Sequence, residues 1–182
     1  ADWYLLVELG SSLPGLREML ETEMAALFEA GLALDGVLAE SVAQAQNLWY
    51  LREAIPEAEA AAGVSVKHDV SVPISRFSQF LSDSRHLLDR QVPDAVFSVF
   101  GHLGDGNLHC NVVVGSASSV SARDVNRAVH DLVGAHGGSI SAEHGLGQYR
   151  VAEWQRLADP LEQELAMRLK TAFDPAGLLN PG

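Results

Sequence analysis

A segment near the middle of the chain combines histidines, glycines and an aspartate at a spacing that suits metal binding. Residues 100–111 have the sequence Phe-Gly-His-Leu-Gly-Asp-Gly-Asn-Leu-His-Cys-Asn. Asp-Gly between two apolar runs is a strong signal for a two-residue hairpin loop. With Asp105 and Gly106 as the loop, His102 lies directly opposite His109, with Cβ atoms roughly 4.5–5.5 Å apart. Two imidazoles at that separation can bind one divalent metal ion.

The alternation of side chains along a strand sorts the neighbours of this histidine pair. Asn111 is two residues beyond His109 and therefore projects from the same face, whereas Cys110 points to the opposite face and is not expected to be a ligand. The alternative interpretation of the two histidines is a partly buried cross-strand pair that binds no metal.

A second cluster follows at residues 139–147, with the sequence Ser-Ile-Ser-Ala-Glu-His-Gly-Leu-Gly. Glu143 could complete a site of two histidines and one carboxylate, which suits Zn²⁺ or another first-row metal with open coordination positions. His144 would then be available as a general base, because its pKa is naturally near working pH. By itself a Glu-His-Gly triplet is typical of a solvated loop, and only the hairpin makes it a candidate site.

Two basic residues are candidates for binding an acidic substrate. Arg52 offers a bidentate guanidinium and Lys67 a point charge for a carboxylate. The alternative is that both form surface salt bridges, which their local sequence favours when it is considered alone.

The elements that must position these residues are indicated by hydrophobic periodicity. A period near 3.6 predicts helices over residues 13–30, 42–62 with an interruption near Pro56, 74–88, 121–135 and 151–172. Short apolar or alternating runs predict strands over residues 3–9, 36–41, 64–72, 95–103, 108–114 and 139–141. Helices and strands that alternate around a tight hairpin favour an α+β sandwich.

Composition narrows the classes of partner. The chain has 182 residues, 47% of them hydrophobic and 20% charged, which is an ordinary globular composition. With 24 acidic and 12 basic side chains the formal charge is −12, so neither nucleic acid nor a membrane is an expected partner. One cysteine cannot form an internal disulfide, which is compatible with a cytoplasmic location. Both ends of the sequence have the character of cuts inside a longer chain.

Six short motifs in this order resemble the C-terminal domain of FAD-linked oxidases, a family that includes D-lactate dehydrogenases, the glycolate oxidase flavin subunit and D-2-hydroxyglutarate dehydrogenase. The motifs occupy residues 49–53, 67–73, 101–109, 141–147, 173–175 and 179–182. The similarity is strongest to the D-2-hydroxyglutarate dehydrogenase-like branch. It implies one substrate- and metal-binding domain over residues 1–182, with ferredoxin-like α/β sandwich lobes.

The resemblance also implies roles for individual residues. His102, His109 and Glu143 match the family's metal-binding residues, and the metal is Zn²⁺ or another divalent ion. His144 matches the residue that acts as the base. Arg52, Lys67 and Asn111 match positions that hold the substrate, and Asn180 matches a position near the flavin. One departure bears on substrate choice: Tyr149 stands where many relatives have a lysine, and Arg150 could substitute for it.

The function implied is oxidation of a D-2-hydroxy acid by hydride transfer to FAD, which a missing N-terminal domain would bind. No glycine-rich phosphate cradle followed by a helix occurs in this sequence, so the chain alone is expected to be inactive and to bind FAD poorly. An electron acceptor is a further expected partner. The sequence leaves open whether the chain forms a homodimer. Two alternative functions are a metal-dependent hydrolase and a non-catalytic module that binds metal or acid.

Overall fold

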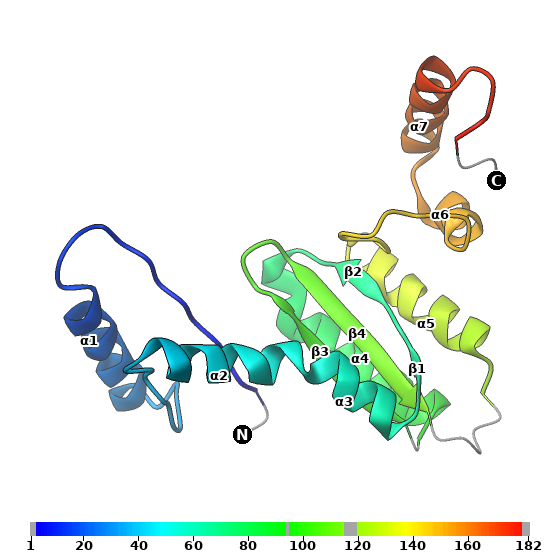
Figure 1. The fold of residues 1–182 in the computed structure, drawn as a ribbon. Coiled ribbons are helices and arrows are strands. Elements are labelled where there is room, and N and C mark those ends of the chain that lie inside the picture. Colours follow the sequence, from blue (N-terminus) through cyan, green and yellow to red (C-terminus); the bar gives the residue numbers. More distant parts are fainter. Residues whose placement is uncertain (1–2, 94, 115–119, 180–182) are drawn as a thin grey trace. The chain divides into compact units, whose positions relative to one another are not determined.

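The computed structural model describes residues 3–93, 95–114 and 120–179. The chain divides into two compact units, Ala1–Ala58 and Glu59–Gly182 (Figure 1). Each unit is described by itself in the following paragraphs.

The first unit is helical. It contains α1 (Leu16–Glu29), α2 (Val42–Glu53) and the start of α3 (Ile55–Ala62). The Ser41 hydroxyl accepts the backbone N–H of Gln44, which satisfies a free donor at the start of α2. Gly31 takes a φ of +67° just after α1, a left-handed conformation that glycine adopts without strain.

The strands predicted at residues 3–9 and 36–41 do not form. Both segments are irregular, and side chains such as Tyr4 and Val37 are 88% and 74% exposed. An apolar run becomes a strand only when a neighbouring strand satisfies its backbone groups, and in the described part of this unit neither run has such a partner. The helix predicted at 42–62 is confirmed, with its interruption at Ala54 directly before the turn that contains Pro56.

The second unit is built on an antiparallel sheet with β4 (Asn107–Val114) at its centre. One edge of β4 pairs with β3 (Val96–His102). The other edge pairs with β1 (Val64–Val66) and β2 (Asp69–Ser71) in one continuous register, since Val64 faces Val114 and Asp69 faces His109. The strand predicted at 64–72 is therefore confirmed, with an interruption between the two short strands.

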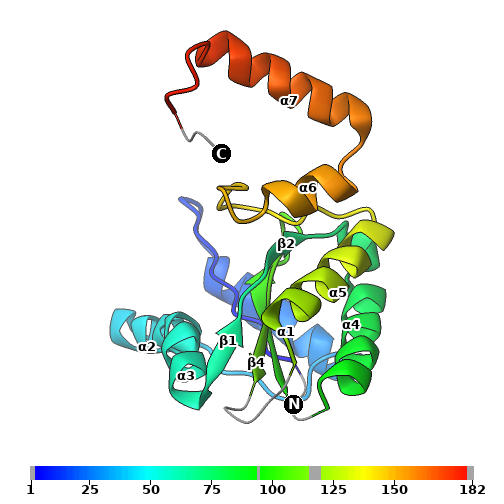
Figure 2. The ribbon, with the colours of Figure 1, turned by 90° about the vertical axis from the view of Figure 1, so that its right-hand side faces the viewer.

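The two faces of this sheet differ in chemistry. Leu108, Cys110 and Val112 point to one face, where they pack in the core against α4 (Phe77–Gln91) and α5 (Ala122–Ala135). The core side chains that these two helices contribute are Phe80, Leu88, Val125, Val129 and Val133. Figure 2 shows α4 and α5 on one side of the sheet and the last turns of α3 on the other. The α3 side is where the polar residues of β4 lie.

The hairpin between β3 and β4 has a longer loop than predicted. His102 pairs with Asn107, so residues 103–106 form a four-residue loop and the predicted pairing of His102 with His109 is wrong. One local and one long-range bond set this geometry: the Asp105 carboxylate accepts the N–H of Asn107 at 3.0 Å, and the Gly106 carbonyl accepts the N–H of Val72 at 3.1 Å. The Asp-Gly pair thus ends the loop instead of forming all of it.

The remaining elements follow prediction in part. The helices predicted at 13–30, 74–88 and 121–135 are confirmed, the second being preceded by the 3₁₀ turn η1 (Ile74–Arg76). The helix predicted at 151–172 is two helices, α6 (Val151–Leu157) and α7 (Pro160–Phe173), because Asp159 caps a new helix with Pro160 in its first turn. The strand predicted at 139–141 is reduced to one bridge, between Ser71 and Ser139. The α+β class is confirmed.

Candidate metal and substrate site

The polar face of the sheet centres on His109. Its imidazole lies on β4 between Asp69, its partner on β2, and Phe100, its partner on β3. The Phe100 and His109 rings stack with centroids 4.9 Å apart and an interplanar angle of 29°. Only 18% of the His109 side chain is exposed. The strand register therefore fixes this imidazole on both sides.

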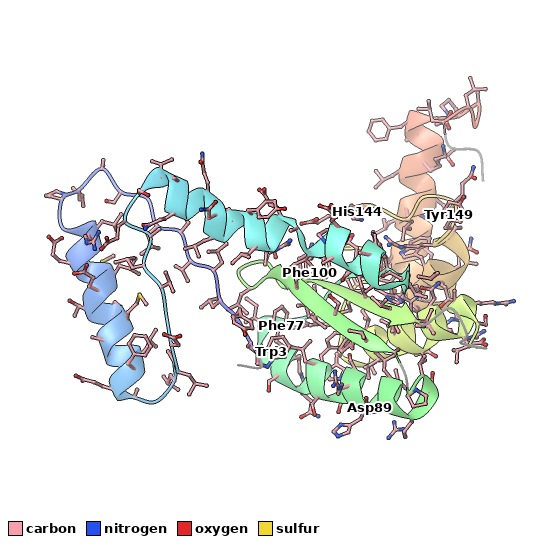
Figure 3. All side chains as sticks on the ribbon, turned by 60° about the horizontal axis from the view of Figure 1, so that its bottom comes forward. Trp3, Phe77, Asp89, Phe100, His144 and Tyr149 are labelled. Carbon is pink, nitrogen blue, oxygen red and sulfur yellow. The ribbon has the colours of Figure 1, made fainter. Side chains whose placement is uncertain are left out.

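The loop that carries Glu143 and His144 is attached to β2 by backbone bonds. Ser71 and Ser139 exchange two hydrogen bonds of 2.9 Å, and the Ala142 N–H donates to the Asp69 carbonyl at 3.3 Å. This attachment brings a Glu143 carboxylate oxygen 4.0 Å from the His109 Nε2 atom, and it places the His144 and His109 ring centroids 6.2 Å apart. Figure 3 shows His144 and, further along the same loop, Tyr149. Two segments far apart in sequence thus meet at His109.

Asp69 connects the sheet to this loop through its side chain. The buried carboxylate accepts the N–H groups of Glu143 at 2.9 Å and His144 at 3.0 Å on Oδ2, which also lies 3.4 Å from His144 Nδ1. Its Oδ1 accepts an amide proton of Asn107 at 3.4 Å. Burial raises the pKa of Asp69, but the two backbone N–H bonds outweigh it, and the net pKa is below the ordinary value.

The residues present fit a divalent metal. Asp69, His109 and Glu143 each offer one ligand atom, and these atoms lie within 4.8 Å of one another. One imidazole and two carboxylates form a donor set that Zn²⁺ and other first-row ions accept. This group contains two of the three predicted ligands, His109 and Glu143. The third predicted ligand, His102, is exposed and lies diagonally from His109 on the same face, so its role as a ligand stays a prediction.

Sequence reasoning gave Asp69 no role. The signal was present, since Asp69 follows Lys67 and His68 in a predicted strand and belongs to one of the family motifs. Which residue Asp69 would face on the next strand depends on the register of β2 with β4, and the pattern of apolar residues leaves that register open.

The predicted substrate residues belong to different parts of the chain. Lys67 is exposed at the interruption between β1 and β2, and Arg52 is half-buried on α2 of the first unit. Asn180 lies outside the described residues. These three assignments therefore stay predictions. Beside them, Arg150 contacts the Ser141 hydroxyl and the Gly145 carbonyl at 3.4 Å each and so supports the loop, whereas Tyr149 is fully exposed.

Asn111 faces the same side as His109, as predicted, but its amide is already engaged. It is 4% exposed. Its Nδ2 donates to both carboxylate oxygens of Glu59 on α3, at 2.8 and 3.1 Å, and its Oδ1 accepts the His68 N–H at 3.2 Å. The side chain thus joins α3 to the sheet, and a role in substrate binding would have to compete with these bonds.

On the opposite face, His68 and Cys110 belong to the core. His68 Nδ1 lies 2.7 Å from the Cys110 carbonyl, and the His68 ring meets His130 edge-on with centroids 5.7 Å apart. Burial lowers the pKa of His68 to about 4 and raises the pKa of Cys110 to about 12. The prediction that Cys110 points away from the site is confirmed.

The fold and this cluster define an α+β domain with a candidate divalent-metal centre on the polar face of its sheet. The chain belongs to the family described as FAD linked oxidases, C-terminal domain, which matches residues 1–182. The resemblance drawn from the six motifs is confirmed.

Individual relatives agree with this family. D-2-hydroxyglutarate dehydrogenase of Stutzerimonas stutzeri is 35% identical over 185 residues, covering 99% of this chain and 40% of that protein. The mitochondrial D-2-hydroxyglutarate dehydrogenase of Arabidopsis thaliana is 36% identical, covering 99% of this chain and 32% of that protein. A putative mitochondrial D-lactate dehydrogenase of Schizosaccharomyces pombe is 35% identical, covering 98% of this chain and 36% of that protein. The chain therefore spans well under half the length of these relatives.

Two observations bear on location. Within residues 3–93, 95–114 and 120–179, no helix combines the length and the apolar character that crossing a membrane requires. Several eukaryotic relatives carry the word mitochondrial in their names. The expected cytoplasmic location of this chain stays a prediction.

Proposed function

We propose that this chain is the substrate domain of an FAD-dependent dehydrogenase that oxidises a D-2-hydroxy acid, of the D-2-hydroxyglutarate or D-lactate type, by hydride transfer to FAD. The relatives named above support the reaction class. The observation that carries the proposal is the gathering of His109, Glu143 and His144 on the polar face of the sheet, where a carboxylate substrate could meet both a cation and a base.

His109 and Glu143, with His102 as the further predicted ligand, would hold a divalent metal. When bound, such an ion supplies Lewis-acid stabilisation of negative charge on a substrate oxygen. Asp69 lies within reach of the same position.

His144 takes the part of the general base. Its side chain is 63% exposed, beside the donor set but outside it. A neutral imidazole there can accept the proton of the substrate 2-hydroxyl, because histidine is the side chain that most often serves as a general base. Lys67 is the proposed source of positive charge for the substrate carboxylates, and the family resemblance assigns the same role to Arg52. The FAD is bound by a part of the full-length protein outside this chain.

The test uses the full-length protein purified with its flavin. Anaerobic mixing with D-2-hydroxyglutarate or D-lactate should bleach the flavin absorbance, and the L-enantiomers serve as controls. Failure of every D-2-hydroxy acid tested to reduce the flavin of metal-supplied protein would contradict the proposal. Hydrolytic turnover by this chain in the absence of flavin would favour a metal-dependent hydrolase instead.

A further inference from the structure

Asp69 is the most buried acid of the candidate site, with 3% of its side chain exposed. A carboxylate is rarely buried without compensation, because burial disfavours its charge. Here the compensation comes from two consecutive backbone N–H groups, those of Glu143 and His144, which both donate to the same oxygen. The buried charge is thus directed at the two loop residues for which a chemical role is proposed.

The hydrogen bonds of Asp69 set it apart from His109 and Glu143. Oδ2 of Asp69 accepts the two backbone N–H bonds that hold the loop, and Oδ1 accepts an amide proton of Asn107. Direct coordination of an ion would have to displace bonds that hold the loop. Glu143, by contrast, has a side chain that is 46% exposed and available to an ion.

The third contact of the Asp69 carboxylate is with the His144 ring, whose Nδ1 lies 3.4 Å from Oδ2. A carboxylate at Nδ1 favours the tautomer that carries its proton there. The Nε2 lone pair is then the one left to accept a proton. The same oxygen that fixes the His144 backbone also turns its ring.

We infer that Asp69 is a positioning residue: its carboxylate fixes the backbone of Glu143 and His144 and orients the His144 imidazole with Nε2 open to substrate. This role rests on the proposed function, and it assigns to β2 a task beyond pairing with β4. The strand register holds Asp69 itself opposite His109. Asp69 therefore sets the spacing between His109, a proposed metal ligand, and His144, the proposed base.

The first test needs no variant. Hydrogen exchange of the wild-type protein should show the Glu143 and His144 amides exchanging at least about ten times more slowly than in an unstructured peptide of the same sequence, since a bonded amide exchanges only when it opens. Exchange at the peptide rate would overturn the inference. This measurement also decides the matter if substitutions at Asp69 prevent folding, and it does not depend on activity.

The second test is Asp69→Asn in the full-length flavoprotein, which keeps the shape of the side chain and removes its charge. We expect kcat to fall about 10²-fold, as a misplaced reacting group does, with KM within about threefold and bound metal unchanged. The matched control is Asp83→Asn on α4, whose carboxylate lies 3.1 Å from His136 Nε2 away from the site and whose loss should leave kcat unchanged.

The positioning role of Asp69 and the proposed function fail on different outcomes. Unchanged kcat in Asp69→Asn overturns the positioning role, and loss of metal in proportion to activity shows that Asp69 is a ligand and overturns it as well. If the wild-type flavoprotein oxidises no D-2-hydroxy acid, the proposed function fails, while the amide exchange still reports whether Asp69 anchors the loop.

Discussion

Phe100 faces His109 across the β3–β4 ladder, and the two rings stack with centroids 4.9 Å apart. His102 faces Asn107 instead, which makes His102 and His109 diagonal neighbours on one face. Diagonal neighbours on an antiparallel pair lie roughly 7–8 Å apart, within reach of long side chains. Cooperation of the two histidines at one ion therefore requires both side chains to lean toward it, a condition that metal-binding measurements can examine.

We expect the protein to bind one divalent ion through His109 and Glu143, with His102 as the third predicted ligand. Metal analysis after loading with Zn²⁺ should show loss of most bound zinc in His109→Ala and in Glu143→Ala, because each removes a donor of the cluster. The zinc content of His102→Ala measures separately what the diagonal histidine contributes to metal binding. Substitution of the exposed His86 on α4 is the matched control. Zinc content that is equal in wild type and in a His102→Ala/His109→Ala double variant would contradict the prediction.

His144→Ala should lower kcat of the full-length enzyme by about 10²–10⁴-fold, the usual effect of losing a general base. Bound metal should be retained, since His144 lies beside the donor set. His109→Ala should instead lower both metal content and turnover. Steady-state kinetics and metal analysis of both variants, prepared with identical metal supply, provide the comparison. A His144→Ala enzyme that loses its metal but keeps the kcat of its remaining holoenzyme would identify His144 as a ligand.

The chain alone should neither retain FAD nor reduce a dye with D-2-hydroxyglutarate. Its described helices do not follow a glycine-rich phosphate loop of the kind that binds a dinucleotide at a helix N-terminus. Absorbance at flavin wavelengths after purification with added FAD is the measurement, and the full-length protein is the positive control. Stoichiometric flavin in the isolated chain would show that the prediction is wrong.

Asn111→Ala should lower the free energy of unfolding by about 1–3 kcal/mol, because the buried Glu59 carboxylate would lose the amide group that donates to both of its oxygens. The loss should be non-additive with Glu59→Ala in a double-mutant cycle, since the two residues share one interaction. Denaturant titration of the four proteins gives the coupling. If Asn111→Ala instead raises KM and leaves stability unchanged, Asn111 acts on substrate, as the family resemblance implies.

Acid should destabilise the protein through His68. Its pKa is about 4 in the folded state, against an ordinary value of 6.5, because burial disfavours the charged form. A lowered folded pKa means that the unfolded chain takes up the proton first. The contribution of His68 to the free energy of unfolding is thus complete above about pH 7 and is lost as pH falls toward 4. By pH 5 this free energy has fallen by about 2 kcal/mol.

The His68 contribution is isolated by comparing variants across the same pH range. In His68→Asn the free energy of unfolding should depend less on pH between 7.5 and 5 than in wild type. The same measurement on a variant with the exposed His86 substituted is the control. Identical pH profiles for wild type and His68→Asn would show that protonation of His68 is not linked to unfolding.

The sequence by itself determined the two main helices of the second unit and the face of β4 on which individual side chains lie. Regular apolar spacing identified α4 and α5, and the alternation of side chains along a strand correctly placed Asn111 on the same face as His109 and Cys110 on the opposite face. These inferences succeed because side-chain direction in a helix or strand is a property of local backbone geometry.

The tertiary structure decided which residues face one another. The loop between β3 and β4 has four residues instead of two, because Gly106 bonds to Val72, the residue directly after β2, a partner 34 positions earlier (106 − 72) that local turn preferences do not include. The same applies to Asp69, whose place opposite His109 and under the Glu143–His144 loop depends on strand register and on backbone bonds between distant segments. Local sequence fixes the face on which a side chain lies, whereas its partner depends on long-range pairing, which forms only when the whole sheet assembles.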